Sequence, residues 1–175
     1  MRRLVAVLAT VALGISMLAL TGAAQTDLVY RYEYSVKVVQ GPCDNEGIGW
    51  GMFFTTVNIH NPWQCQAVHY RIKLAVAGYG GGLGPVPSWV DPRQPLIADG
   101  VTEYDGAYFY TMPTYPQIPG GVFFEGYFVI QSEDELDVVA VYTGSGFPDP
   151  KSQLATMYSE RVPARRIEVC AKPEG

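Results

Sequence analysis

Apolar and polar residues alternate along several stretches of this chain. Every second residue is apolar over 28–38, over 68–76 and, except for Thr55, over 53–60, and most residues between them are polar or charged. A period of two places successive side chains on opposite faces of a strand, so each stretch predicts a half-buried β-strand. We expect 53–60 and 68–76 to pair as an antiparallel hairpin, joined by a turn at Asn61-Pro62-Trp63-Gln64.

More strongly apolar stretches lie in the second half of the chain. The segments 122–132 and 136–143 predict the two strongest strands, with a tight turn at Glu133-Asp134 between them. The segment 154–162 predicts a last long strand, which 166–170 extends.

The two strongest strands are apolar on both faces. Val138 and Ala140 alternate with Val139 and Val141, and 122–132 has the same character. Adjacent strands of this kind belong at the centre of a sheet whose outer face is covered as well. We expect the aromatic and proline-rich segment 104–119 to form this cover as irregular structure over the core. The alternative cover is a second copy of the protein, so a homo-oligomer stays open.

Glycine and proline separate the predicted strands, and the chain has 19 Gly, 13 Pro and 12 Tyr. Loops rich in these residues are expected at 41–49 and 78–95, and no helical period of useful length occurs beyond the N-terminus. The pattern predicts an all-β fold, a sandwich of two antiparallel sheets with about seven strands and long Gly/Pro/aromatic loops. A small closed barrel is the alternative.

The first two dozen residues have the pattern of a secretory signal peptide. A basic start at 1–3 precedes the uncharged apolar run 4–20 and the small residues 21–24. This pattern predicts a signal helix over 1–24, cleaved after Ala24 or one residue earlier, and a single domain over 25–175 that is secreted or periplasmic. The alternative is an uncleaved anchor, although the run is slightly short of the roughly 20 residues that span a membrane.

The charge of the chain limits its partners. The sequence has 12 Lys+Arg and 17 Asp+Glu, and removal of Arg2 and Arg3 with the signal leaves 10 against 17, a net charge of −7. Nucleic-acid binding needs a clustered basic surface, so we do not expect a nucleic-acid partner. No later segment is apolar over a sufficient length to cross a membrane, so no stable span is expected after cleavage.

Three cysteines, Cys43, Cys65 and Cys170, are an odd set in an exported chain. One disulfide with one free thiol fits an oxidising compartment, and the pairing stays open. Cys43 and Cys65 flank opposite ends of one predicted strand, which favours a bridge from either of them to Cys170. No motif places a base beside a cysteine, and the spacings match no zinc site.

Two histidines and two tryptophans are the candidate ligand-binding residues: His60, His69, Trp63 and Trp89. The predicted hairpin places Asn58 opposite His69, one pair from His60, but two imidazoles are fewer ligands than most metal sites use. We therefore expect no metal and no cofactor, and we interpret His60 as a turn residue whose ring bonds loop backbone. Exposed aromatic rings on loops bind sugars or peptides, whereas we interpret the aromatic stretch 104–115 as a lid over the core.

Two carboxylates are candidates for a catalytic pair. Glu125 and Asp137 stand on two strands that the pattern makes neighbours, and glycoside cleavage uses such a pair. No local signature identifies either residue, and we name no catalytic residue.

Four short segments carry a resemblance: 58–62 (NIHNP), 126–132 (GYFVIQS), 136–143 (LDVVAVYT) and 160–163 (ERVP). In this order they resemble the strand motifs of a group of small exported bacterial proteins of unknown function. The resemblance implies an exported all-β protein. It implies no activity, because no catalytic residue is assigned in that group, and the segment 78–120 departs from the group's pattern.

The sequence thus predicts a non-enzymatic exported module that works by binding or assembly, with an unknown protein or glycan as its partner. A carbohydrate-binding module or carbohydrate-active enzyme is the alternative.

Overall fold

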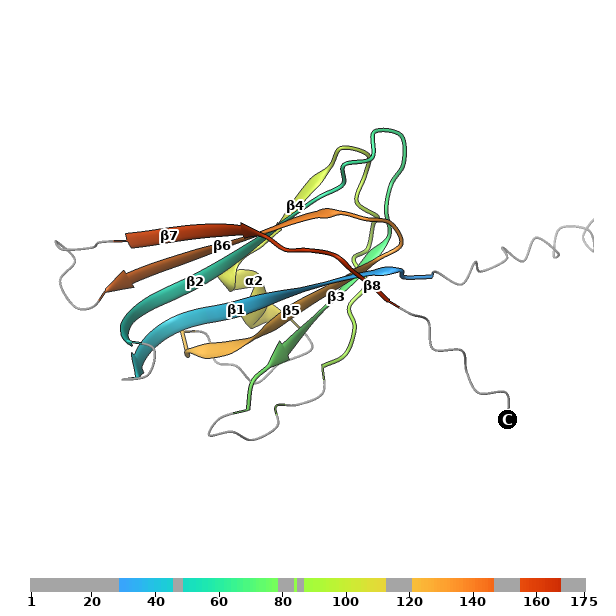
Figure 1. Cartoon of the computed structure of the whole chain (residues 1–175). Helices are drawn as coiled ribbons and strands as arrows, with labels where there is room; N and C mark the ends of the chain where they lie inside the picture. The colour runs from blue at the N-terminus through green and yellow to red at the C-terminus, as the bar shows by residue number, and fades with distance from the viewer. Residues whose placement is uncertain are drawn as a thin grey trace, which may run out of the picture.

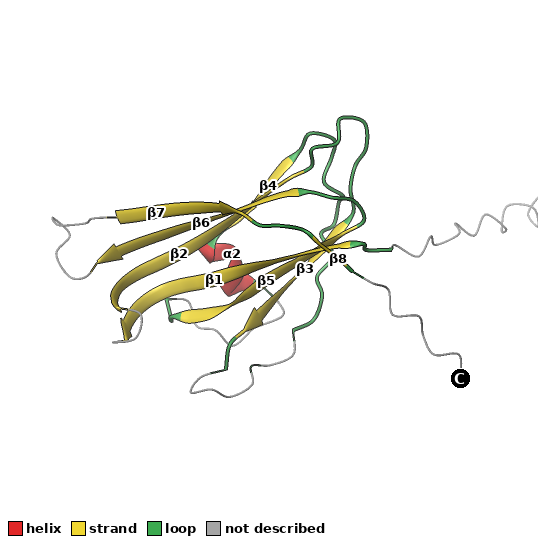
Figure 2. Ribbon diagram, in the orientation of Figure 1, coloured by secondary structure: helices red, strands yellow, loops and turns green. Residues whose placement is uncertain are grey.

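The computed structural model describes residues 29–45, 49–78, 84, 87–112, 121–146 and 155–167. These residues form antiparallel strands and one short helix, which confirms the all-β class (Figures 1 and 2). The elements are β1 (Tyr32–Asn45), β2 (Gly49–His60), β3 (Tyr70–Val76), β4 (Val101–Tyr104), α2 (Gly106–Thr111), β5 (Phe124–Ser132), β6 (Asp137–Gly146), β7 (Ala155–Arg161) and β8 (Arg165–Arg166). The predicted signal peptide over 1–24 and Cys170 lie outside the described residues.

The strands form one continuous eight-stranded sheet rather than the predicted two separate sheets of seven strands. Its order is β3-β5-β1-β2-β6-β7, with β4 paired to β2 and β8 paired to β1. The long strand β1 makes the sheet continuous, because its residues 32–40 pair with β5 and its residues 41–45 pair with β2. Strand pairing therefore includes residues 41–45 and 49, where the glycine and proline content predicts a loop.

The change of partner in β1 occurs at Gly41. This residue has a φ of 98°, and a Cβ there would lie 2.7 Å from the carbonyl oxygen of Val122, so glycine is required. Thr55 of β2 secures the bend, because its hydroxyl lies 3.0 Å from both the nitrogen and the oxygen of Val39. Its own backbone nitrogen donates to the side chain of Gln40 at 3.3 Å.

The predicted hairpin between 53–60 and 68–76 does not form, because β2 pairs with β1, β6 and β4 whereas β3 pairs with β5. The chain leaves β2 at the fully buried Asn61. The side-chain amide nitrogen of this residue lies within 3.0 Å of the carbonyl oxygens of Gln66, Leu96 and Ile97. These contacts hold the connecting segment against 96–97, so the chain reaches β5 instead of turning back along β2.

The two strongest predicted strands are correct as strands and wrong as neighbours. β5 lies between β3 and β1, and β6 lies between β2 and β7, so each is central, but β1 and β2 separate them. The short link after β5 crosses from one half of the sheet to the other. Tyr34 of β1 fixes it, because the backbone nitrogen of Leu136 donates to the Tyr34 hydroxyl at 2.7 Å and that hydroxyl donates to the Leu136 oxygen at 2.9 Å.

The aromatic residues of 104–112 pack against the inner face of the sheet. Tyr104, Phe109 and Met112 are buried, and the rings of Tyr104 and Phe109 lie 5.2 Å and 5.3 Å from that of Phe128. This confirms the core lid as far as residue 112. It contradicts an outer cover by these residues, because Phe128 faces inward between Val36 and Leu74.

The helix α2 was not predicted from the sequence. Six residues are too few to show a helical period, and its start is marked only by Asp105, whose carboxylate accepts a hydrogen bond from the Tyr108 nitrogen at 3.0 Å. The helix lies on the inner side of the bent sheet (Figure 1).

Alkaline pH is expected to destabilise the protein through Tyr34. Burial raises the pKa of this phenol to about 12 from an ordinary value of 10.0. The folded state therefore keeps the proton longer than the unfolded state, so stability is complete below pH 10 and is lost as the pH rises towards 12. Urea unfolding between pH 8 and 12 measures the loss.

Tyr34→Phe provides the control for this experiment. It removes the hydroxyl and leaves the Leu136 nitrogen without its partner, which costs about 1–3 kcal/mol at neutral pH. Because the variant lacks the phenol, its stability should fall less steeply than that of the wild type above pH 10. Parallel pH curves for the two proteins would contradict the assignment to Tyr34.

Candidate functional site

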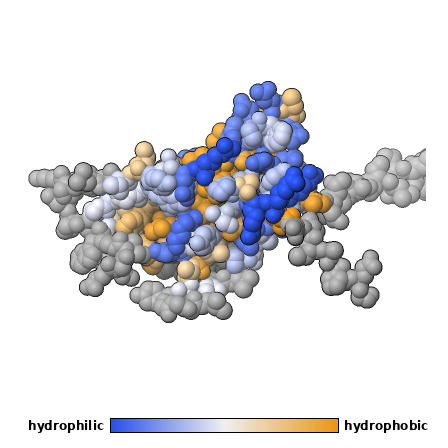
Figure 3. Space-filling view, in the orientation of Figure 1, coloured by the Kyte–Doolittle hydropathy of each residue, from blue (hydrophilic) through white to orange (hydrophobic). Residues whose placement is uncertain are grey.

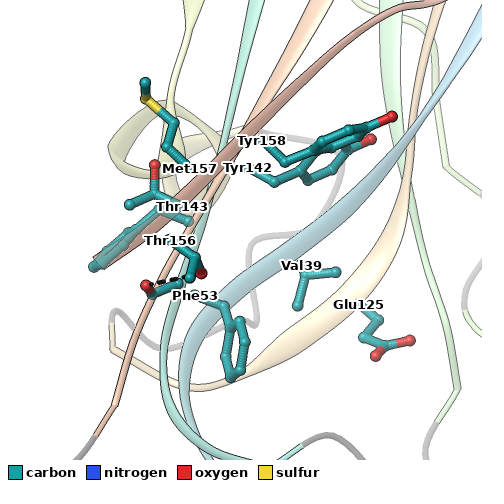
Figure 4. A pocket seen from close by; sticks show the side chains of 10 residues that line it. Val39, Phe53, Glu125, Tyr142, Thr143, Thr156, Met157 and Tyr158 are labelled. Atoms are coloured by element: carbon teal, nitrogen blue, oxygen red, sulfur yellow. Dashed lines mark hydrogen bonds between the residues drawn. The ribbon is translucent and has the colours of Figure 1, made fainter. Parts of the chain in front are cut away.

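A shallow groove of about 300 Å³ opens between β1 and β5 on one side and β6 and β7 on the other (Figure 4). Ten residues line it: Val39, Phe53, Phe54, Glu125, Tyr142, Thr143, Gly144, Thr156, Met157 and Tyr158. Figure 3 shows apolar surface on this side of the molecule, bordered by hydrophilic residues.

Two tyrosines form one wall of the groove. Tyr142 and Tyr158 are paired across β6 and β7, so their rings stack with centroids 6.3 Å apart and planes 21° apart. Tyr158 is 62% exposed, whereas Tyr142 lies deeper. The Tyr142 hydroxyl donates to Glu160 at 2.9 Å. Burial and the Glu160 carboxylate raise the pKa of Tyr142, so its hydroxyl stays protonated at neutral pH.

Residues from the other half of the sheet complete the groove. Val39 and Glu125 are paired across β1 and β5 and point toward the groove from the side opposite the tyrosines (Figure 4). The Glu125 carboxylate is 2.7 Å from Lys37 Nζ, so a cation already compensates its charge. Phe53 is paired with Gly144, whose missing side chain leaves the ring open to the groove.

The predicted carboxylate pair does not form. Glu125 lines the groove, whereas Asp137 stands at the first position of β6 and pairs with Arg161. The prediction assumed that β5 and β6 are neighbours, and two strands separate them. These two carboxylates therefore cannot flank one glycosidic bond.

His60 lies between two carboxylates. Its Nε2 is 3.1 Å from Asp99 and its Nδ1 is 3.5 Å from Asp137. The interpretation of this ring as a partner of loop backbone is therefore wrong.

His69 is separate from this cluster, because β3 is not paired with β2, and Asn58 lies opposite Glu103 and Val139 instead. The backbone nitrogen of His69 donates to Glu133 at 3.2 Å. Within the described ranges, no group of three or more His, Cys, Asp or Glu could hold a metal ion.

The two candidate tryptophans lie apart from each other. Trp63 is 44% exposed, and its indole nitrogen donates to the Glu135 oxygen at 2.9 Å, which attaches it to the link between β5 and β6. Trp89 instead lies against β3, where Lys73 Nζ is 4.2 Å from its ring centroid. Neither tryptophan lines the groove, so the candidate residues of the sequence do not form one site.

Cys43 is buried and Cys65 is exposed, and these two described cysteines are not bonded to each other. They stand near opposite ends of β2, since Cys43 pairs with Gly51 and Cys65 follows His60 in the chain. The predicted separation of these two cysteines is confirmed. A bridge to Cys170 stays a prediction, because that residue lies outside the described ranges.

The groove residues Tyr142 and Tyr158 were missed from the sequence. Sixteen positions separate them, and only the register between β6 and β7 brings their rings together. The available signal was the regular spacing of Thr156, Tyr158 and Glu160, which places an exposed ring on one face of a strand.

Comparison of the chain with protein-family models, with curated proteins and with solved structures finds no match. The resemblance to small exported bacterial proteins therefore stays a prediction. In the part of the chain that the structure describes, no helix has the length and apolar character needed to cross a membrane.

Proposed function

We propose that the protein is an exported, non-enzymatic binding module that holds a saccharide in the aromatic groove. The stacked pair of Tyr142 and Tyr158 carries this proposal, because it presents a large exposed ring that is held rigidly by a second ring. Such a ring offers a flat apolar surface for the C–H face of a sugar at little cost in side-chain entropy.

Polar groups beside the ring match the hydroxyl groups of a sugar. Thr156 with its hydroxyl, Glu125 with its carboxylate and Tyr142 with its phenol all line the groove. A few such groups around an apolar surface are typical of small-molecule sites, where they fix the orientation of the ligand.

The arrangement of the carboxylates at and near the groove supports binding of a saccharide without its hydrolysis. A glycosidase of the usual kind needs two carboxyl groups on either side of the scissile bond. The groove residue Glu125 is paired with Lys37, and Glu160, which does not line the groove, accepts a hydrogen bond from the Tyr142 hydroxyl. Neither has the arrangement of a general acid facing a second carboxylate, which supports a binding role.

We also propose that the two halves of the sheet serve as the two layers of a sandwich, and that residues 1–24 export the chain to the periplasm or the medium. The hydrogen bonds between Tyr34 in one half and Leu136 at the start of the other support the layered arrangement.

A glycan array and a reducing-sugar assay on the secreted protein test this function. We expect specific glycan binding and no release of reducing sugar. Tyr158→Ala should weaken the binding of the best glycan about tenfold, because it removes one stacking ring worth about 1–1.5 kcal/mol.

Ser159→Ala is the matched control, since Ser159 is the next residue of β7, is exposed, and is not among the residues that line the groove. It should bind as the wild type does. The absence of any bound glycan, or equal binding by the Tyr158 variant, would overturn the proposal.

A further inference from the structure

Two cations share one indole ring on the outer face of β3. The Arg71 guanidinium carbon lies 4.5 Å from the centroid of Trp89, and Lys73 Nζ lies 4.2 Å from it. The Arg71 carbon is also 4.4 Å from the ring of Tyr30. Cation–π attraction to these rings offsets part of the repulsion between the two like charges.

The neutral side-chain amide of Gln131 lies between Arg71 and the carboxylate of Glu33 in a chain of hydrogen bonds. Arg71 Nε and Nη2 donate to the same oxygen of Gln131 at 2.9 Å and 2.7 Å, and the Gln131 nitrogen donates to Glu33 at 2.7 Å. The Glu33 carboxylate in turn pairs with Arg165. The charge of Arg71 is therefore not compensated through this network.

Among the described residues, neither Arg71 nor Lys73 forms an ion pair. The neighbouring carboxylate of Asp91 accepts a hydrogen bond from the Tyr30 hydroxyl at 3.2 Å. The Nη1 group of Arg71 and the Lys73 ammonium thus keep donors without protein partners in this part of the chain. An arginine oriented by two rings and an amide is well suited to bind a carboxylate.

The outer face of β5 connects these cations to the groove. Val129, Tyr127 and Glu125 point to the same face, since they alternate along the strand. Val129 is paired with Lys73, Tyr127 is 50% exposed, and Glu125 lines the groove. Aromatic rings therefore occur along this face at Trp89 beside Lys73 and at Tyr127, and the face reaches the groove at Glu125.

We infer that the ligand is an extended acidic saccharide, with a carboxylate bound by Arg71 and Lys73 at Trp89 and neighbouring sugars stacked on Tyr127 and in the groove. This inference rests on the proposed function. A peptide added as a further strand fits less well here, because β5 is paired on both sides and Ile72 of the edge strand β3 is already bridged to Val90.

Isothermal titration of the secreted protein with oligogalacturonate and with its methyl ester tests the inference. The acid should bind about tenfold more tightly than the ester at low salt, because only the acid makes charge-assisted hydrogen bonds, and the difference should shrink as salt is added. Lys73→Gln should abolish most of this preference, and Lys73→Arg should keep it.

Arg161→Gln is the matched control, because it makes the same change in net charge on β7, away from β3. It should leave the preference intact. Equal affinity for acid and ester, or binding of neutral array glycans only, would overturn the inference and leave the proposed function standing. A failure to bind any glycan would overturn both. Tighter binding of poly-L-glutamate than of any oligouronate would overturn the saccharide in favour of an acidic peptide.

Discussion

Val138→Glu should leave the protein unfolded, whereas Val139→Glu, at the next residue of β6, should fold. Val138 is fully buried against the inner face and is paired with Ile59. A carboxylate there has no partner, and burying it costs several kcal/mol, a large share of the roughly 5–15 kcal/mol that stabilise a domain. Circular dichroism and size-exclusion chromatography would detect the loss of structure.

Val139 faces the other side of the sheet. It is half-buried and is paired with Asn58 on one side and Arg161 on the other. A glutamate there lies next to the Arg161 cation, so the cost should stay within about 1 kcal/mol. If the wild type is a dimer and Val139→Glu is a monomer, this outer face is the assembly surface. Unfolding of both variants would contradict the assignment of the two faces.

Gly41→Ala should lower the free energy of unfolding by about 3 kcal/mol or more. The methyl group would meet the Val122 oxygen at 2.7 Å and the Tyr110 hydroxyl at 2.8 Å, and the φ of 98° already disfavours a side chain. Because β1 changes partner at this residue, the clash affects both halves of the sheet. Urea unfolding at neutral pH measures the effect.

Gly121→Ala separates the cost of the steric clash from the cost of the positive φ. Gly121 also has a positive φ, of 81°, but a Cβ there has no neighbouring atom within 4 Å. Its substitution should therefore cost only the backbone term, about 1 kcal/mol. Equal losses for the two variants would show that the close approach at Gly41 does not matter.

Strand positions were predictable because their signal is local. The alternation over 53–60 and 68–76 gave the cores of β2 and β3, and the two-sided apolar pattern placed β5 and β6 correctly in central positions. A period of two reports the burial of each face and contains no information about which strand lies alongside.

Strand partners were not predictable because they depend on distant contacts. The buried amide of Asn61 and the bend at Gly41 decide where the chain goes after β2 and within β1. Neither residue differs in sequence from an ordinary turn residue.

The candidate binding site could not be predicted from the sequence for the same reason. The groove depends on the register of Tyr142 with Tyr158, and the cation site depends on Trp89 lying over β3. Trp89 was the one ligand-binding candidate of the sequence that takes part in a proposed site.

Carbon–proton NMR spectra of the protein with labelled aromatic residues, recorded during titration with the best-binding glycan, test the binding surface most directly. We predict that the ring signals of Tyr142, Tyr158, Tyr127 and Trp89 shift, while those of the buried Tyr104 and Phe109 do not. Shifts confined to Trp63 and His60, at the far end of β2 from the groove, would contradict the account.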